Sequence, residues 1–496
     1  MSAAADVCLI LEGTYPYVRG GVAEWAHLLI ERLPHLTFHL WCVVPNAAFC
    51  KLAYEPPKNV TGVTNVHLFE DPLKGSREPV PDAVFQIARE FHEKGQGVAG
   101  RMRVLFERLA PVLPNFRGAL PAEELLFGDR AYDLLVELYT KNARELPFID
   151  YFYTYLFSHF PLFKLMAAGV PPARLYHTIA TGYAGFLGAR ARQESGRPLL
   201  LTEHGIYTNE RTVEIILAEW VYSRPKERIS IGTSGQSLKK VWMDLFDFLG
   251  RVTYQATDRI TTLFGGNRDL QIRLGADAGK IEVISNGVDL DRFQVGARAL
   301  DPRQPLVGLV GRVVAIKDVR TFVRACRTVA DRIPEARFAV IGPTDQEPAY
   351  YQKCLDQRRL LRLEDRLTFT GPANVTEWYA KLDVLALTSV SEGLPLTVLE
   401  GSACGVPLVC TRVGACEELL NGRTPEDRAL GPSGLVTDVG DHRAIGRAIA
   451  AILADRGQAR RLGDAGRQRV QRFYDLRVIV AEYDRLYRDW LARSVN

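Results

Sequence analysis

Residues 389–400 read SVSEGLPLTVLE, and the interpretation of the whole chain starts from this stretch. It follows an apolar run, Val384–Leu387, that is typical of a buried strand, and it leads into a predicted helix, Thr397–Ala403. A glycine-containing loop that opens a helix leaves backbone N–H groups free, which favours an anion at the helix start. Glu392 lies in the loop and Glu400 in the helix. Eight residues at a helical rise of about 1.5 Å per residue would place the two carboxylates about 12 Å apart. This separation suits the two ends of a sugar nucleotide, whose diphosphate would face the backbone of Gly393, Leu394, Pro395 and Leu396.

Two cations precede this stretch in the same predicted domain. Residues 308–318 read GLVGRVVAIKD and follow a predicted strand, Pro305–Val310. Arg312 and Lys317 therefore come at the carboxyl end of a strand, where open α/β sheets bind ligands. A guanidinium grips two oxygens and an ammonium adds a point charge, so the pair suits a diphosphate. Two solvated surface cations are the alternative if the pair is considered alone.

The first half of the chain carries two further candidate positions. The apolar run Val7–Leu11 predicts a strand buried on both faces, and Gly20 and Gly21 follow it just ahead of a predicted helix, Val22–Leu33. Two glycines there let the backbone approach a phosphate closely, although a plain strand–helix turn is the alternative. His204 ends another apolar strand, so it is placed for function more than for a structural role.

The order of these motifs resembles the retaining glycosyltransferases of family 4, which have the GT-B fold. Residues 254–263 resemble the last strand of the family's first domain, and residues 286–289, Asn-Gly-Val-Asp, match its passage into the second domain. The resemblance implies that Arg312 and Lys317 hold the diphosphate, Glu392 acts at the sugar and phosphate, and Glu400 binds the ribose. It further implies that Gly20 and Gly21 border the diphosphate, that Gly371 opens a loop at the base, and that His204 lines the sugar pocket. More narrowly, residues 12–22 (EGTYPYVRGGV) and 201–207 (LTEHGIY) resemble the PelF group of exopolysaccharide glycosyltransferases.

Alternating strand and helix signals predict a doubly wound, parallel sheet in the second domain. The resemblance implies two such Rossmann-like domains facing across a cleft. Residues 1–295 form the first, with a helical insertion at about 70–150, and residues 296–475 form the second, which binds the nucleotide sugar. Residues 476–496 are predicted as a helix that crosses back to the first domain. Residues 148–170 are aromatic and apolar but contain charged residues and a proline, so a buried helix is favoured over a membrane-bound or partner-binding one.

Composition excludes several classes of function. The net charge of +4 is small and no basic run is present, which argues against nucleic-acid binding. No Gly-x-Gly-x-x-Gly follows a strand and no Walker motif occurs. The eight cysteines form no zinc-ligand pattern and are expected to be buried free thiols. Asp289 and Asp291 are expected in a turn, so no metal is predicted. The start of the sequence resembles a first strand more than a signal peptide, which predicts a cytoplasmic location.

The resemblance implies a metal-independent glycosyltransferase of Pel-type exopolysaccharide biosynthesis without a cofactor. The expected donor is a UDP-sugar, with UDP-glucose as the first choice and UDP-N-acetylhexosamine as the second choice. The expected acceptor is a growing polysaccharide. The resemblance also implies inner-membrane Pel synthase proteins as partners, through which the chain would be peripheral at the inner membrane. The alternative is a non-catalytic subunit of such a synthase that binds a UDP-sugar.

Overall fold

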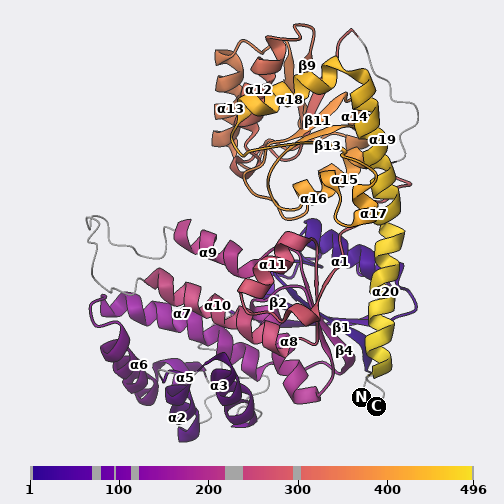
Figure 1. Cartoon of the computed structure of the whole chain (residues 1–496). Coiled ribbons are helices and arrows are strands. Elements are labelled where there is room, and N and C mark those ends of the chain that lie inside the picture. The colour runs from indigo at the N-terminus through magenta and orange to yellow at the C-terminus, as the bar shows by residue number, and fades with distance from the viewer. Residues whose placement is uncertain are drawn as a thin grey trace. The chain divides into compact units, whose positions relative to one another are not determined.

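The computed structural model describes residues 4–69, 80–93, 97–112, 122–217, 238–293 and 303–493 (Figure 1). Contacts divide the chain into two compact units. The first unit comprises Met1–Thr262, Arg268–Glu282 and Asp484–Asn496, and the second comprises Leu263–Asn267 and Val283–Tyr483. The sequence predicts the boundary at residue 295, whereas the main division of the structure follows Glu282.

A seven-stranded sheet of order β3-β2-β1-β4-β5-β6-β7 forms the centre of the first unit. β1 (Ala5–Glu12) pairs in parallel with β2 (Phe38–Val44) on one side and β4 (Ala173–Thr178) on the other. Residues 7–11 are completely buried, which explains the continuous apolar run. The other strands are β3 (Val60–His67), β5 (Leu199–Glu203), β6 (Arg259–Thr262) and β7 (Ile281–Val283). The helices outside the insertion are α1 (Gly21–Arg32), α8 (Tyr183–Ser195), α9 (Tyr207–Leu217), α10 (Leu238–Ala256) and α11 (Gly265–Arg273).

The segment between β3 and β4 is helical, as the sequence predicts. Its elements are α2 (Asp82–Phe91), α3 (Val98–Arg103), a π-helix η3 (Val104–Leu109), α4 (Ala110–Val112), α5 (Ala122–Phe127), α6 (Asp129–Asn142) and α7 (Phe148–Ala167). Within the predicted insertion, residues 70–79, 94–96 and 113–121 lie outside the described residues.

The aromatic segment forms α7, which belongs to the core of the first unit. Tyr151, Phe160 and Met166 are buried, while Ile149 and Tyr153 are about half exposed on another face (56% and 50%). The buried-helix interpretation is therefore confirmed for most of its length. Across the part of the chain that the structure describes, no helix has both the length and the apolar character needed to cross a membrane.

The end of the first sheet differs from the expectation. The sequence interpretation takes residues 254–263 as the last strand of this domain, but α10 continues to Ala256 and β6 begins only at Arg259. In this last turn of α10, the buried Tyr254 hydroxyl donates to the Glu203 side chain at the end of β5 at 2.7 Å. β7 then adds one more strand at the edge of the sheet, so β6 is not the last.

The second unit has a six-stranded parallel sheet of order β10-β9-β8-β11-β12-β13. Its strands are β8 (Leu306–Val310), β9 (Arg337–Ile341), β10 (Leu367–Phe369), β11 (Val384–Leu387), β12 (Leu408–Thr411) and β13 (Gly434–Thr437). Its helices are η6 (Ala315–Lys317, a 3-10 turn), α12 (Val319–Ala330), α13 (Pro348–Leu360), α14 (Val375–Tyr379), α15 (Leu396–Ala403), α16 (Cys416–Asn421), α17 (Pro425–Arg428), α18 (His442–Ala454) and α19 (Arg456–Phe473). α20 (Leu476–Arg493) follows, and its residues from Asp484 onward belong to the first unit.

The cysteines behave as expected from their apolar surroundings. All eight are free thiols, and seven are buried, Cys50 being partly exposed. Burial raises the pKa of the Cys8 and Cys326 thiols well above the usual value. These side chains therefore act as small apolar core residues.

Candidate functional site

The second sheet reverses its strand order between β8 and β11. From β8 the chain moves outward to β9 and β10 on one side, and it returns to β11 and β12 on the other. The loops that leave β8 and β11 therefore separate at the carboxyl edge of the sheet, where doubly wound folds bind ligands. Arg312 and Lys317 follow β8, and Glu392 follows β11. The sequence-predicted cations and carboxylate thus stand on the two loops at this reversal.

Lys317 and Glu392 are in direct contact there. The Lys317 ammonium lies 2.5 Å from Glu392 Oε1, and the two side chains are only 23% and 12% exposed. The buried hydroxyl of Ser389 donates to the same oxygen at 2.5 Å. Two donors therefore fix Oε1, and no hydrogen bond from a described residue occupies Glu392 Oε2. The arrangement therefore holds the Glu392 carboxylate through one of its two oxygens.

Backbone contacts bind the two loops together. The Val390 N–H donates to the Ile316 carbonyl at 2.9 Å, and the Thr388 hydroxyl donates to the Lys317 carbonyl at 3.0 Å. On the other side of the carboxylate, the Ala415 N–H donates to the Gly393 carbonyl at 2.9 Å. Gly414 has a φ of +50°, and a Cβ there would lie 2.1 Å from the Gly393 carbonyl oxygen. Only glycine fits at 414, so this residue supports the loop of Glu392.

Arg312 and Gly371 lie on neighbouring loops of the same edge. The exposed Arg312 guanidinium donates to the side-chain oxygen of Gln346 at 2.8 Å. The Gly342 N–H, after β9, donates to the carbonyl of Gly371, after β10, at 3.1 Å. A Cβ at Gly342 would lie 2.2 Å from the Gly311 carbonyl oxygen, so the loops after β8 and β9 meet backbone to backbone. Sequence reasoning gave no signal for Gln346, because the contact spans 34 residues.

Glu400 lies in α15, which begins at Leu396 directly after the Glu392 loop. Pro395 precedes the helix and provides no side-chain cap, so the first N–H groups of α15 are not capped by that residue. The Glu400 carboxylate accepts a hydrogen bond from the buried hydroxyl of Tyr379 at 2.7 Å. This partner was also missed by the sequence interpretation.

The first-unit candidates lie at the carboxyl edge of the first sheet. Gly20 precedes α1 and has an extended backbone conformation. A Cβ atom added at Gly20 or at Gly21 would meet no other atom within 4 Å. Space beside the start of α1 is therefore open. His204 directly follows β5, and its ring packs edge-on against Trp25 with ring centroids 4.7 Å apart. Burial lowers the pKa of His204 to about 4, so its imidazole is neutral at pH 7.

Glu12 is a residue at this edge that the sequence interpretation did not select. It ends β1, beside the reversal between β1 and β4, and accepts the Ala184 N–H at 3.0 Å in the first turn of α8. The Tyr207 hydroxyl donates to its other oxygen. Glu12 therefore caps α8 and ties it to α9, which favours a structural role.

The buried histidines of the first unit predict a loss of stability in acid. Burial lowers the pKa of His177 to about 3 and that of His159 to about 4, as it does for His204. The unfolded chain binds protons at histidine below about pH 6.5, whereas the folded chain stays neutral until about pH 4. Stability is therefore full above pH 6.5 and falls with decreasing pH, by about 2 kcal/mol for each histidine at pH 5.

Thermal unfolding at pH 7 and pH 5 checks this expectation. In the His177→Gln variant, which removes one of these titrating groups, the difference in Tm between the two pH values becomes smaller. The His442→Gln variant, at the start of α18, serves as the control and keeps the wild-type difference. An unchanged difference in His177→Gln would contradict the assignment.

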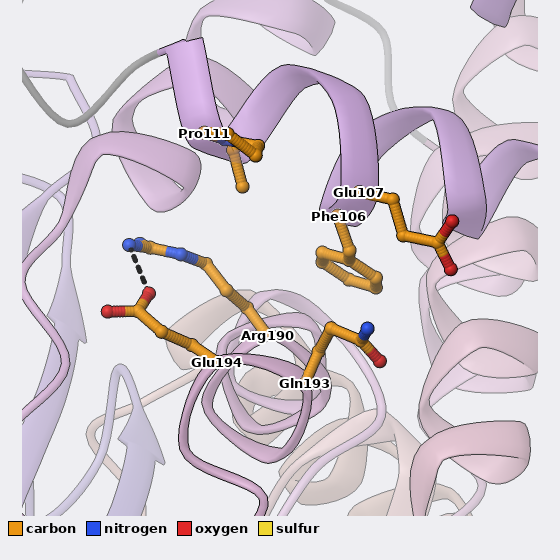
Figure 2. A pocket seen from close by; sticks show the side chains of 7 residues that line it. Phe106, Glu107, Pro111, Arg190, Gln193 and Glu194 are labelled. Carbon is orange, nitrogen blue, oxygen red and sulfur yellow. Dashed lines mark hydrogen bonds and ion pairs between the residues drawn. The ribbon is translucent and has the colours of Figure 1, made fainter.

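Two hollows of the first unit have structural explanations. One, of about 310 Å³, lies between η3 and α8 (Figure 2). Its Arg190 donates to the Leu165 carbonyl at 2.7 Å and to the Ala168 carbonyl at 2.5 Å, and it pairs with Glu194 at 3.1 Å. Arg190 thus satisfies the C-terminal carbonyls of α7, as a cation does at a helix end.

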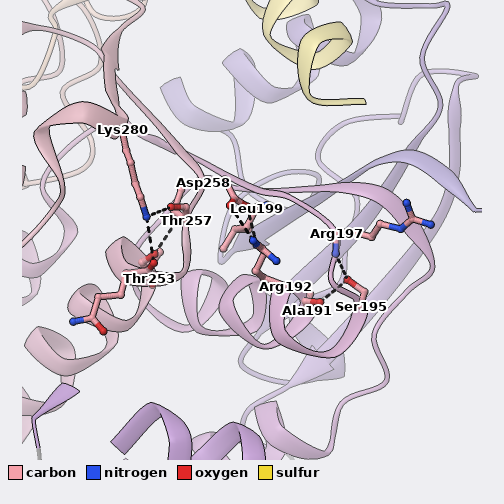
Figure 3. Close-up of polar contacts among 10 residues, drawn as sticks. Ala191, Arg192, Ser195, Arg197, Leu199, Thr253, Thr257, Asp258 and Lys280 are labelled. Carbon is pink, nitrogen blue, oxygen red and sulfur yellow. Dashed lines mark hydrogen bonds and ion pairs between the residues drawn. The ribbon is translucent and has the colours of Figure 1, made fainter. Parts of the chain in front are cut away.

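A second hollow, of about 330 Å³, lies at the opposite, amino edge of the first sheet. Figure 3 shows that Arg192 there grips Asp258, at 2.8 and 3.1 Å, while the Leu199 N–H also donates to that carboxylate. Arg192 and Arg493 stand in the last turns of α8 and α20. Their positive charges offset the partial negative charge at the C-terminal ends of these two helices. Little positive charge is therefore left for an anion, and the hollow is a poor anion site.

Asp289 makes a turn, as expected. Its side chain accepts the backbone N–H groups of Asp291 and Arg292 at 3.0 and 3.3 Å. Within the described ranges, no group of three or more His, Cys, Asp or Glu side chains is arranged to hold a metal ion.

Comparisons with known proteins agree with this architecture. Residues 5–279 match the family model described as a domain of unknown function, DUF3492, which covers more than half of the chain. Residues 304–455 match the model described as glycosyl transferases group 1.

Curated relatives match mainly part of the chain. The D-inositol 3-phosphate glycosyltransferase of Rhodococcus jostii (strain RHA1) is 30% identical over 212 residues, which are 38% of this chain and 47% of that protein. The lipopolysaccharide core biosynthesis mannosyltransferase LpsB of Rhizobium meliloti (strain 1021) is 32% identical over 220 residues, 42% of this chain and 61% of that protein. The chain thus spans less than two thirds of the length of these relatives.

Two solved structures match nearly the whole chain. Sucrose-phosphate synthase (tll1590) from Thermosynechococcus elongatus superposes with a TM-score of 0.60 at 20% identity, covering 99% of this chain and 100% of that one. Anabaena Alr3699/HepE in complex with UDP superposes with a TM-score of 0.59 at 15% identity, covering 98% and 100%. These likenesses confirm the predicted GT-B fold. The chain belongs to the DUF3492 family and carries a glycosyl transferases group 1 domain in its second unit.

Proposed function

We propose that the chain is a retaining glycosyltransferase that transfers a hexose from a UDP-sugar to a growing polysaccharide. The observation that carries the proposal is the 2.5 Å contact between Lys317 and Glu392 at the strand-order reversal of the second unit. A cation and a carboxylate fixed at this edge provide the charges that a leaving diphosphate and a reacting sugar require.

Lys317 and Arg312 act on the diphosphate in this proposal. As the bond from the anomeric carbon to the diphosphate oxygen lengthens, negative charge accumulates on the diphosphate. Fixed cations therefore stabilise the transition state more than the bound substrate. The choice of UDP is supported by the similar structure of Anabaena HepE, which was solved in complex with UDP.

Glu392 acts at the sugar as a positioning and electrostatic group. Its Oε1 is fixed by Ser389 and Lys317, which leaves Oε2 for the donor sugar and its phosphate. The acceptor hydroxyl then attacks the anomeric carbon as the bond to UDP breaks. Its proton passes to the leaving phosphate oxygen, and the configuration at the anomeric carbon is retained.

The other predicted residues complete the donor site. Glu400 binds the ribose hydroxyls, the loop at Gly371 contacts the base, and the backbone of residues 393–396 faces the diphosphate. In the first unit, the neutral His204 lines the sugar pocket, and Gly20 and Gly21 border the diphosphate.

We expect transfer to need no metal ion, because Arg312 and Lys317 supply the charge that a divalent cation would otherwise supply. The rate of UDP release therefore stays within about twofold when EDTA is added to protein freed of metals. The measurement is the initial rate with and without EDTA, and with added Mg²⁺ or Mn²⁺. A loss that Mg²⁺ or Mn²⁺ restores would contradict the expectation.

The polymer is proposed to be a Pel-type exopolysaccharide. UDP-glucose is the preferred candidate for the donor, and UDP-N-acetylhexosamine is the alternative. The loop at residues 12–22 supports this choice through its resemblance to the PelF group. Synthesis of such a polymer would place the chain beside inner-membrane synthase proteins. The relative from Rhizobium meliloti is also named for a biosynthetic process, that of the lipopolysaccharide core.

Release of UDP from a panel of UDP-, GDP- and ADP-sugars, with and without oligosaccharide acceptors, tests the proposal. Release from one UDP-sugar that is abolished in Glu392→Gln is the expected result. Binding of a UDP-sugar by calorimetry without any release would instead favour a non-catalytic subunit.

A further inference from the structure

Tyr379 is the buried partner of Glu400, and nothing in the sequence motifs marks it. Its hydroxyl donates to Glu400 Oε2 at 2.7 Å, and its side chain is completely buried. The carboxylate itself lies in a partly exposed part of α15. A buried donor therefore holds one end of a carboxylate whose residue reaches the surface.

The position of the Tyr379 hydroxyl is fixed from several sides. Its ring packs edge-on against Phe293, with ring centroids 6.1 Å apart. The Asn374 side chain caps the start of α14 by accepting the Thr376 N–H at 3.2 Å. Four residues after α14 ends, the Asp383 side chain accepts the Leu306 N–H at 2.8 Å. This hydrogen bond joins the segment that follows α14 to the start of β8. Because packing and hydrogen bonds hold both ends of α14, the tyrosine is a rigid support.

Burial and the negative charge of Glu400 raise the pKa of Tyr379 well above the usual value, which favours the protonated phenol. The phenol therefore donates the hydrogen bond and the Glu400 carboxylate accepts it. Such charge-assisted hydrogen bonds are shorter and stronger than neutral ones.

We propose that Tyr379 is a positioning residue that orients Glu400 for the ribose hydroxyls and so gives the site its preference for a ribonucleotide. The inference rests on the proposed function, in which Glu400 meets the ribose. A carboxylate that accepts a hydrogen bond from a buried, fixed donor is restrained in its orientation, so it loses less rotamer freedom when it binds ligand hydroxyls. Without the tyrosine hydroxyl, the carboxylate loses its fixed orientation and its preference for ribose hydroxyls.

Calorimetry with UDP and with 2′,3′-dideoxy-UDP tests this assignment on the full chain. Wild-type protein binds UDP more tightly than the dideoxy compound. In Tyr379→Phe the affinity for UDP falls by about tenfold, as expected for a lost hydrogen bond to a charged group. The affinity for dideoxy-UDP stays unchanged, so the discrimination between the two ligands is lost.

Tyr350→Phe is the matched control. It removes a tyrosine hydroxyl of the same unit that accepts the Arg320 N–H at 3.4 Å. This variant keeps the wild-type discrimination. A general loss of stability in Tyr379→Phe would weaken both ligands equally, and that result would overturn the assignment.

A second variant covers the case in which Tyr379→Phe does not fold. Glu400→Asp shortens the side chain and separates the carboxylate from the tyrosine hydroxyl, so it too loses the discrimination. If Tyr379→Phe or Glu400→Asp still binds UDP and keeps the wild-type preference for UDP over dideoxy-UDP, the positioning role is refuted. Absence of UDP binding to wild-type protein refutes the proposed function itself, and the two failures are thereby distinguished.

Discussion

Replacing Lys317 with alanine lowers the rate of UDP release by about a thousandfold, the size of effect known for a single fixed donor to a developing anion. Two physical losses add up. The leaving diphosphate loses a cation beside β8, and Glu392 loses the ammonium that lies 2.5 Å from its Oε1. Since both losses act while the bond to UDP is breaking, the expected effect is mainly on kcat.

The measurement is kcat and KM for the donor that the panel identifies. Lys353→Ala is the control, because Lys353 is exposed on α13 of the same unit. Its kinetic constants are expected to equal those of the wild type. A Lys317→Ala enzyme with more than a tenth of the wild-type kcat would contradict the proposed role of Lys317.

Replacing Asp427 with alanine lowers the stability of the second unit by about 3–5 kcal/mol, because it leaves a buried charge without its partner. Asp427 and Arg469 are 2% and 1% exposed and lie 2.5 Å apart. The same guanidinium donates to the carbonyls of Leu420 at 2.8 Å and Gly431 at 2.7 Å. Arg469 therefore joins α19 to the loops around α16 and α17, and its charge is balanced by Asp427 alone among these contacts.

Hydrogen exchange of backbone amides measures this loss of stability separately in each of the two units. Backbone amides of β12 and β13 are expected to exchange faster in Asp427→Ala by a factor that corresponds to the lost stability. Amides of β1 and β2 in the first unit serve as the internal reference. Asp356→Ala breaks an ion pair with Arg359 that is more than half exposed, so no measurable change is expected there. Equal exchange in Asp427→Ala and in wild-type protein would refute the prediction.

Strands that are buried on both faces were the most predictable part of the fold. The apolar runs Val7–Leu11 and Val384–Leu387 are visible in the sequence, and they form most of β1 and all of β11. Each is a continuous apolar run bordered by polar residues, so composition suffices to predict a buried strand. The alternation of such runs with helical segments also predicted the doubly wound sheet of the second unit.

Boundaries that depend on contacts between distant residues were not predictable. Residues 254–256 were assigned to a strand from the local sequence, yet they form the last turn of α10, where Tyr254 contacts Glu203. β7 is only three residues long, and its place in the first sheet depends on that sheet already being formed. Local pattern contains no information about either contact.

The candidate site shows the same division. Its charged residues were visible as motifs because their order along the chain follows the loops at one edge of the sheet. The neighbours that hold them, Ser389, Tyr379, Gln346 and Gly414, were not selected. Tyr379 lies 21 residues from Glu400, and Gln346 lies 34 from Arg312. The roles of the site residues in catalysis stay predictions until they are tested.

The central claim is that the loops after β8 and β11 form the donor site. A crystal structure of the full chain with bound UDP tests it most directly. The account predicts that the diphosphate oxygens lie within hydrogen-bond distance of Arg312 and Lys317, with the ribose hydroxyls on Glu400. UDP bound elsewhere, with Lys317 still paired to Glu392 and no nucleotide beside it, would contradict the claim.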